Sequence, residues 1–205
     1  MAISELSAKR LALLNEAVPG VRAVAVLWNA DDLGMTLRYR AAEVEAKRLG
    51  MQIVPLGVHA PDDLDAAFAA MSEKPPDAIL MLTDILTVLN RKRVIDFAAK
   101  RRLPAIYEYA FLAHDGGLMA YGPNMDAIFD RAAGLVDQIL KGASPADPPL
   151  ALPTRFDLAI NLETAKTTTT AAVAARPSWK LVTLHRAEAM IRAFLARRVM
   201  KQASE

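Results

Sequence analysis

The sequence predicts an α/β protein built on a doubly wound, mostly parallel sheet. Short apolar runs of strand length start near residues 21, 51, 77 and 104, so they recur every 26–30 residues, the length of one strand–helix unit. The first run, AVAVLW at 23–28, is apolar throughout, as expected for a strand buried on both faces of a parallel sheet. Segments with helical periodicity lie between the runs, which indicates right-handed crossovers between parallel strands.

The expected strands are runs of four to eight residues. They lie at 23–28, 51–58, 77–82, 104–107, 118–121 and 155–162. Pro55 in the second run indicates an edge strand or an irregularity, because proline cannot donate a ladder hydrogen bond. The last run, RFDLAINL, alternates large apolar residues with polar or small ones, so we expect it to be half-buried, in a different sheet or at an edge.

The expected helices are amphipathic, and several have recognisable ends. They cover 4–17, 31–50, 61–74, 84–102, 109–114 and 125–142. Ser4 is a candidate N-cap, and Pro19 follows the end of the first helix. Gly50 suits the position just after the second helix, where a left-handed residue often terminates the last turn.

Two of these helices have clear apolar faces. The segment 84–102 is expected to be one helix with Leu86, Val94, Phe97 and Ala98 on its inner face. The segment 125–142 has the most regular pattern in the sequence. Its stripe consists of Met125, Ile128, Phe129, Ala132, Leu135, Val136 and Ile139.

The chain divides into three parts by composition. Residues 1–142 are predicted to form one α/β domain, and 143–165 to be a connector followed by a strand, because ASPADPP is stiff, polar and rich in proline. Residues 166–205 form a divergent tail. It contains eight basic residues and only two acidic ones, Glu188 and Glu205. Within this tail, 183–201 has the pattern of a basic amphipathic helix, which would lie on a membrane surface, dock a partner or pack as an ordinary helix.

Composition and missing motifs exclude several classes of function. The net charge of +2 among 205 residues does not favour nucleic acid, and Arg91–Arg93 and Lys100–Arg102 are interpreted as a solvated helix face. The chain has no cysteine, its three histidines are isolated, and the common phosphate, acyl-transfer and zinc motifs are missing. We therefore expect no metal, no cofactor and no enzymatic activity. The paired carboxylates Asp31–Asp32 and Asp62–Asp63 are interpreted as helix caps rather than catalytic pairs.

Polar and aromatic residues follow the predicted strands, at the edge where parallel sheets bind ligands. They are Asn29, Asp31, His59, Thr83, Asp84, Tyr107, Glu108, Tyr109, Tyr121, Gly122 and Asn124. Asp84 and Glu108 would hold the ammonium group of a ligand, and helix N-termini would bind its carboxylate. Tyrosine rings would pack against its apolar or aromatic part. This set fits an amino-acid-like ligand. The alternative is that each residue only caps a helix, packs or forms a turn.

Several stretches together resemble the substrate-binding proteins of ABC transporters, in the family that includes aromatic amino-acid receptors. They are ELSAKRLALLNEAVPGVRAVAVLWN, PDDLDAAFAAM, RLPAIYEYAFLAHDGGLMAYGPN and RAAGLVDQILKGASPADPPLALPTRFDLAINLETAK. The resemblance implies one lobe of a type I periplasmic-binding-protein-like fold, the second of two lobes, with 143–165 as the hinge connector and crossover strand. It also implies a periplasmic or cell-surface receptor that delivers a small-molecule solute to an ABC permease and meets the membrane only through that transporter. The ligand contacts implied in this lobe fall on Thr83, Asp84, Glu108, Tyr109, Tyr121 and Asn124.

The sequence departs from that family at both ends. The family's first lobe and signal peptide are not found before residue 5, and the tail after Lys166 does not resemble the family's ending. On this basis we expect a chain that is cytoplasmic as encoded or a fragment, and that binds solute weakly. The alternative function is a free-standing cytosolic α/β regulatory or enzymatic domain that uses the same edge of the sheet.

Overall fold

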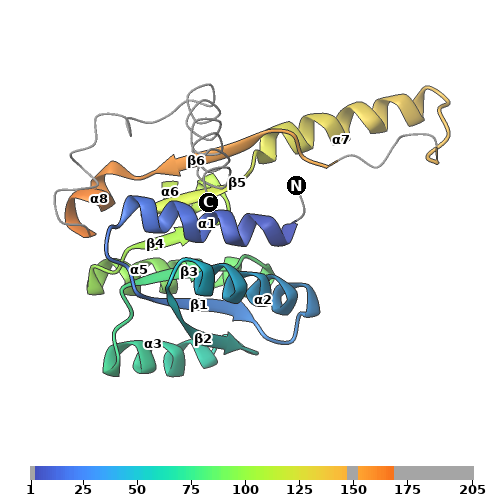
Figure 1. Ribbon diagram of the computed structural model, residues 1–205. Helices are drawn as coiled ribbons and strands as arrows, with labels where there is room; N and C mark the ends of the chain where they lie inside the picture. The colour runs from blue at the N-terminus through green and yellow to red at the C-terminus, as the bar shows by residue number, and fades with distance from the viewer. Residues whose placement is uncertain (1–2, 147–151, 169–205) are drawn as a thin grey trace, which may run out of the picture.

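The computed structural model describes residues 3–146 and 152–168, which contain a six-stranded sheet with helices on both faces (Figure 1). The strand order is β2-β1-β3-β4-β5-β6, and β1 to β5 are parallel. The strands are β1 (Ala23–Asn29), β2 (Gln52–Val58), β3 (Ala78–Met81), β4 (Ala105–Tyr107), β5 (Met119–Pro123) and β6 (Phe156–Ile160). The predicted doubly wound, mostly parallel α/β sheet is confirmed.

The two edges of the sheet agree with the residue patterns. β2, which contains Pro55, is one edge strand, and β6 is the other. β6 runs antiparallel to β5 and pairs Leu158 with Tyr121 and Asp157 with Gly122. The alternating pattern of 155–162 therefore marks an edge of the same sheet rather than a second sheet.

Two hydrophobic clusters, one on each face, hold the helices to the sheet. On one face, α1 (Ile3–Ala17) and α2 (Leu33–Arg48) contribute most of the helix residues, and α8 (Leu162–Thr168) adds Ala165. On the other face lie α3 (Asp63–Glu73), α5 (Arg91–Arg101) and α6 (Ala110–His114). Neighbouring residues of a strand alternate between the clusters, as Val24 and Ala25 do, so the central strands are buried on both faces.

The segment predicted as one helix over 84–102 is two helices, α4 (Ile85–Leu89) and α5, with Asn90 between them. The Asn90 side chain donates to the carbonyl oxygen of Leu86 at 3.0 Å, so the asparagine competes with the backbone for the last turn of α4. The inner face of α5 is nevertheless as predicted. Val94 and Ala98 are buried, and Phe97 packs against the same cluster.

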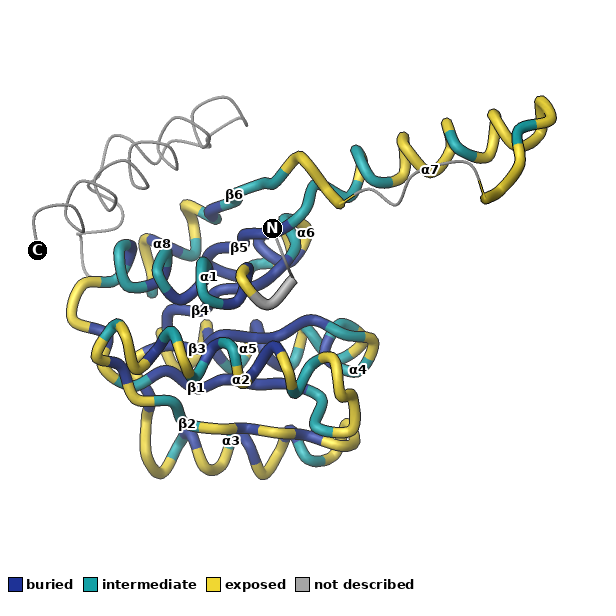
Figure 2. The backbone as a smooth tube through the Cα atoms, turned by 45° about the vertical axis from the view of Figure 1, so that its right-hand side comes forward, coloured by how far each residue is buried: buried dark blue, intermediate teal, exposed yellow. Residues whose placement is uncertain are grey.

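The helix α7 (Met125–Leu140) forms where its sequence predicts, but it extends away from the sheet (Figures 1 and 2). None of its residues is buried. Phe129, Val136 and Leu140 are 65%, 55% and 81% exposed. The apolar stripe of α7, which in most folded proteins would face a core, is therefore exposed in the described part of the chain.

The predicted basic helix over 183–201 and the tail beyond residue 168 lie outside the described residues. None of the helices among the described residues combines the length and the apolar character that a membrane-spanning helix needs.

Candidate functional site

The carboxyl ends of β1, β3, β4 and β5 lie at one edge of the sheet, and we call the residues that follow these strands the rim. The rim carries Asn29, Thr83, Asp84, Tyr109 and Asn124 from separate parts of the sequence, and Glu108 and Tyr121 lie at the ends of the same strands. Since parallel strands end at the same edge, the topology places the predicted site residues in one region of the molecule. Their side chains, however, point in different directions.

Asp84 is a fixed acceptor at the rim. Its carboxylate accepts a hydrogen bond from the backbone N–H of Thr87, so it is the N-cap of α4, and from the Asn29 side chain at 2.6 Å. Burial acts to raise the pKa of Asp84, but these hydrogen bonds outweigh it and hold the pKa below its usual value. Asp84 is therefore ionised at neutral pH and brings a negative charge to the rim.

Thr83 lies beside Asp84 and is 6% exposed. Its hydroxyl has no hydrogen-bond partner in the described part of the chain. A buried hydroxyl without a partner costs free energy, about 1–3 kcal/mol in protein mutational data, so a group that bonds to it stabilises the protein.

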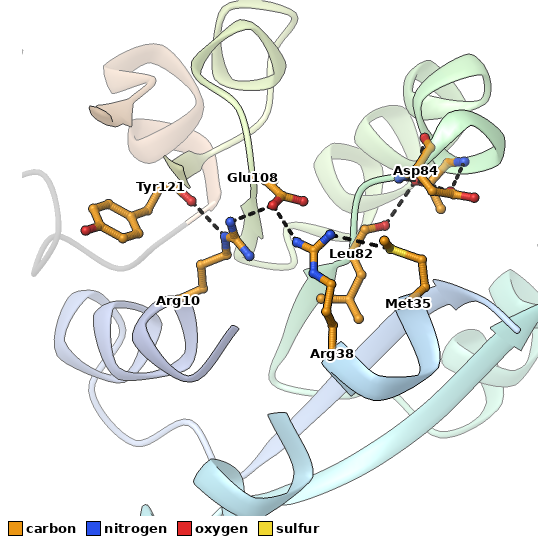
Figure 3. Close-up of polar contacts among 8 residues, drawn as sticks. Arg10, Met35, Arg38, Leu82, Asp84, Glu108 and Tyr121 are labelled. Atoms are coloured by element: carbon orange, nitrogen blue, oxygen red, sulfur yellow. Dashed lines mark hydrogen bonds and ion pairs between the residues drawn. The ribbon is translucent and has the colours of Figure 1, made fainter. Parts of the chain in front are cut away.

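Glu108 lies beneath the rim, on the side of the sheet covered by α1 and α2 (Figure 3). Its Oε1 atom accepts from Arg10 Nη2 of α1 at 2.9 Å and from Arg38 Nη2 of α2. All three residues are buried, with exposed fractions of 0% for Arg10, 7% for Arg38 and 3% for Glu108. We call these residues the Arg–Glu–Arg cluster. Oε1 of Glu108 is thus engaged by two arginines inside the protein, whereas its Oε2 is buried and has no hydrogen-bond partner in the described part of the chain.

The Arg–Glu–Arg cluster joins α1 and α2 to β5 and to the residue that follows β4. Arg10 Nε also donates to the carbonyl oxygen of Tyr121 in β5 at 2.7 Å, and Arg38 Nη1 approaches the sulfur of Met35 at 3.5 Å. Burial lowers the pKa of Arg10, and the neighbouring charge of Glu108 acts against this. Two guanidinium groups share one carboxylate, so the cluster has a net positive charge directly under the rim.

Tyr121 also points beneath the rim. It is 2% exposed, and its ring lies 6.1 Å from the ring of Phe156 and 5.9 Å from the ammonium of Lys9, measured to the Tyr121 ring centre. Burial raises the pKa of its hydroxyl. In contrast, Tyr109 is partly exposed at the start of α6, and its ring stacks on that of Phe111 with 5.9 Å between the centres.

Asn124 caps α7 and connects it to β6. Its Oδ1 accepts from the N–H of Ala127 at 2.7 Å, and its Nδ2 donates to Asp157 at 2.7 Å. Just before it, Gly122 packs so close to β4 that an added Cβ would collide with the carbonyl oxygen of Glu108. Position 122, near the end of β5, therefore requires glycine.

The other strand-end candidates lie at the margin of the rim or inside the core. His59 Nδ1 lies 2.6 Å from Asp31, and both side chains are exposed. Tyr107 is fully buried, and burial raises its pKa far above the usual value. Among residues 3–146 and 152–168, no group of three His, Cys, Asp or Glu side chains is placed to hold a metal ion.

Sequence reasoning missed Arg10 and Arg38 as part of this region. Arg10 lies four residues after Leu6 and four before Leu14, which are both buried, so it occupies a core position of α1. A charged residue at a core position of an amphipathic helix requires a buried partner, and that signal was available in the sequence. The partner, Glu108, was not.

Comparisons with known proteins agree with this fold. A tyrosine-binding protein from Clostridioides difficile (strain R20291) is 22% identical over 158 residues, covering 77% of this chain and 46% of the relative. A solved ABC domain in complex with L-Trp from Streptococcus pneumonia has a TM-score of 0.70 at 19% identity, covering 82% of this chain and 59% of that one. A ligand-free, open substrate-binding protein from Clostridium difficile has a TM-score of 0.63 at 21% identity, with coverages of 85% and 58%.

These likenesses define the fold as one lobe of a type I periplasmic-binding-protein-like architecture. The chain spans about half the length of the curated relative that it matches. Residues 4–174 match the family described as ABC transporter substrate binding protein. The chain therefore belongs to the family of ABC transporter substrate-binding proteins.

Proposed function

We propose that this chain is a solute-binding lobe of an ABC-type uptake receptor, and that an amino acid or a related small molecule binds at the rim. The observation that carries the proposal is the convergence of polar groups from four strand ends at one edge of the sheet, in a chain of this family. In open α/β sheets, ligands bind outside the carboxyl ends of the strands. In this function the chain is a binding protein rather than an enzyme.

The ligand class is supported by the relatives and by the chemistry of the rim. One relative is a tyrosine-binding protein, and one structural neighbour holds L-Trp. The Asp84 carboxylate suits an ammonium group, the Thr83 hydroxyl lacks a partner in the described part of the chain, and Tyr109 offers a partly exposed ring.

The six predicted contact residues then divide into two groups. Thr83, Asp84, Tyr109 and Asn124 would contact the solute, because their side chains are at the rim or capping the helices that begin there. Glu108 and Tyr121 would support the rim from below through Arg10. This division assigns direct recognition to Asp84 and a positioning role to Glu108.

The affinity of the chain alone would be low. Residues 1–142 would be the lobe and 143–165 the connector through the hinge, so a second lobe would supply the other wall of the cleft. If a complete receptor binds at about 1 μM, or about 8 kcal/mol, then half of the contacts leave about 4 kcal/mol, which corresponds to millimolar binding at best. The entropic cost of association does not halve with the contacts. The complete receptor would act in the periplasm or at the cell surface and deliver its solute to a permease.

Titration of ¹⁵N-labelled protein with L-tyrosine and L-tryptophan, followed by NMR, tests the proposal. We expect amide shifts at Thr83, Asp84, Tyr109 and Asn124, with a dissociation constant in the millimolar range or weaker. Asp84→Asn should remove these shifts while keeping the helix cap, because asparagine caps as well as aspartate. The matched control is Asp96→Asn, which removes an exposed carboxylate of α5 that pairs with Lys92. Shifts elsewhere, or an unchanged titration of Asp84→Asn, would contradict binding at the rim.

A further inference from the structure

Asn29, the last residue of β1, lies at the rim but is not among the proposed solute contacts. Its Nδ2 atom donates to Oδ2 of Asp84 at 2.6 Å, and its Oδ1 atom accepts from the backbone N–H of Asp31 at 3.0 Å. The N–H of Asp31 can only donate, so it pairs with the amide oxygen of Asn29 and leaves the amide nitrogen for Asp84. Asn29 therefore presents a donor to the Asp84 carboxylate.

The two oxygens of this carboxylate are held by different parts of the chain. Oδ1 accepts from the backbone N–H and the hydroxyl of Thr87, which is three residues further along in α4. Oδ2 accepts from Asn29, which is 55 positions away in the sequence. Thr87 ties Asp84 to its own helix, whereas Asn29 ties it to the neighbouring strand.

The backbone of the two strands holds this side-chain contact in register. β1 and β3 are parallel neighbours, and the N–H of Leu82 donates to the carbonyl oxygen of Leu27 at 2.9 Å. Asn29 and Asp84 each lie two residues beyond that bond. Because the backbone already fixes both ends of the contact, little further ordering is needed to form it.

We propose that Asn29 is a positioning residue of the solute site, which holds the Asp84 carboxylate ionised and in one place for the ammonium group of the solute. Burial acts to raise the pKa of Asp84, and the hydrogen bonds from Thr87 and Asn29 lower it, because they favour the ionised form. A carboxylate that is fixed in advance loses less freedom when a solute binds. This role rests on the proposed function, in which Asp84 contacts the solute.

Other ionisable groups lie on the elements around Asp84, and Figure 3 shows several of them. They are Asp31 after β1, Arg10 of α1, Arg38 of α2, and Glu108 and Tyr109 after β4. Asn29→Leu removes one neutral donor and leaves all of these groups in the chain. A changed titration of Asp84 in that variant would therefore report on the lost hydrogen bond.

The Asp84 carboxyl signal of the ¹³C-labelled full chain, followed by NMR from neutral pH downwards, tests the proposal. The matched control is Asn161→Leu, because Asn161 also uses both ends of its amide, but its partners are the backbone groups of Ala113, Glu163 and Thr164. Both substitutions should lower the stability of the chain. Only Asn29→Leu should move the titration midpoint of Asp84 to higher pH, since a structural loss elsewhere leaves the donors of Asp84 in place.

Tyramine gives a second measurement, because it has an ammonium group and no carboxylate. Protonated Asp84 does not attract a cation, so amide shifts caused by tyramine should be lost at a higher pH in Asn29→Leu than in Asn161→Leu. The comparison covers the pH range in which the amide spectra show a folded chain.

The possible failures of the two proposals can be told apart. If tyramine binds but the carboxyl titrations of the unchanged chain and both variants coincide, or Asn29→Leu leaves the tyramine profile unchanged, the role of Asn29 is overturned and the proposed function stands. If the unchanged chain shows no shifts with tyramine at neutral pH, binding of an ammonium group at Asp84 is overturned, and the role of Asn29 in recognition falls with it.

Discussion

Glu108→Gln tests the role of the Arg–Glu–Arg cluster most directly. The carboxylate is 3% exposed and is the acceptor for both Arg10 and Arg38. Replacing it with a neutral amide changes the net charge of the cluster from +1 to +2 and leaves two buried guanidinium groups without a counter-charge. Removing one partner of a buried ion pair typically destabilises a protein by about 3–5 kcal/mol. This is a large part of the total stability of a domain, about 5–15 kcal/mol.

Arg10→Met is the informative comparison, because it changes the charge in the opposite direction. The cluster becomes a neutral pair of Arg38 and Glu108, and the main loss is the hydrogen bond to the Tyr121 carbonyl oxygen. Leaving that buried acceptor without a partner costs about 1–3 kcal/mol. The net-charge argument therefore predicts that loss of the single anion destabilises more than loss of one of two cations.

Urea unfolding monitored by Trp28 fluorescence measures both variants. Trp28 is buried and stacks on Tyr39 with 3.9 Å between ring centres, so its emission reports on the packing of α2 against β1. Trp179→Phe in all samples removes the second tryptophan, which lies outside the described residues. The difference between the variants should persist at high salt, because a buried cluster is weakly screened. An equal or larger loss for Arg10→Met would refute the charge argument.

Three further predictions follow from single contacts. Asn124→Ala removes the N-cap of α7 and should cost about 0.5–2 kcal/mol, seen as faster amide exchange in the first turn of α7. Gly122→Ala forces a Cβ against the Glu108 carbonyl and should lower the free energy of unfolding by about 1–3 kcal/mol or more in urea titrations, whereas Gly134→Ala, which meets open space, should not. The hydrogen bond and charge of Asp31 raise the pKa of His59, so the contribution of this pair to stability is complete below pH 6.5 and is lost as the pH rises through the folded pKa. An NMR titration should show a His59 pKa above 6.5 that returns toward that value in Asp31→Asn.

The fold was predictable because its signals are local and repeat along the chain. Each central strand is an apolar run, as AVAVLW is, and residues such as Gly50 mark helix ends. The break at Asn90 was missed because the apolar spacing of Leu86, Val94 and Ala98 continues across it. The Asn90 side chain, which donates to the Leu86 carbonyl oxygen, marks the end of α4. Hydrophobic periodicity alone did not predict this helix end, because the end depends on a side chain that competes for backbone hydrogen bonds.

The position of the rim was also predictable, but the direction of its side chains was not. Along a strand, successive side chains alternate between faces, so Glu108 shares the face of Ile106, and Tyr121 shares the face of Met119. Both Ile106 and Met119 belong to the cluster under α1 and α2. The alternation gives the side of the sheet on which Glu108 lies. It does not show that Arg10 and Arg38 reach the carboxylate, because that contact joins residues 98 and 70 positions apart.

The contacts of Glu108 have a consequence for recognition at the rim. Both arginines donate to Oε1 of Glu108, so a ligand ammonium would have to reach the buried Oε2, at a desolvation cost and against the repulsion of two guanidinium groups. Asp84 has no such cost, because its partners are the neutral groups of Asn29 and Thr87 and it keeps its helix cap when a cation approaches. The difference in desolvation favours Asp84 as the ammonium acceptor, while the net positive charge of the Arg–Glu–Arg cluster favours placing a ligand carboxylate on the Glu108 side of the rim. An amino acid would then lie with its charged groups oriented along the line from Asp84 to Glu108.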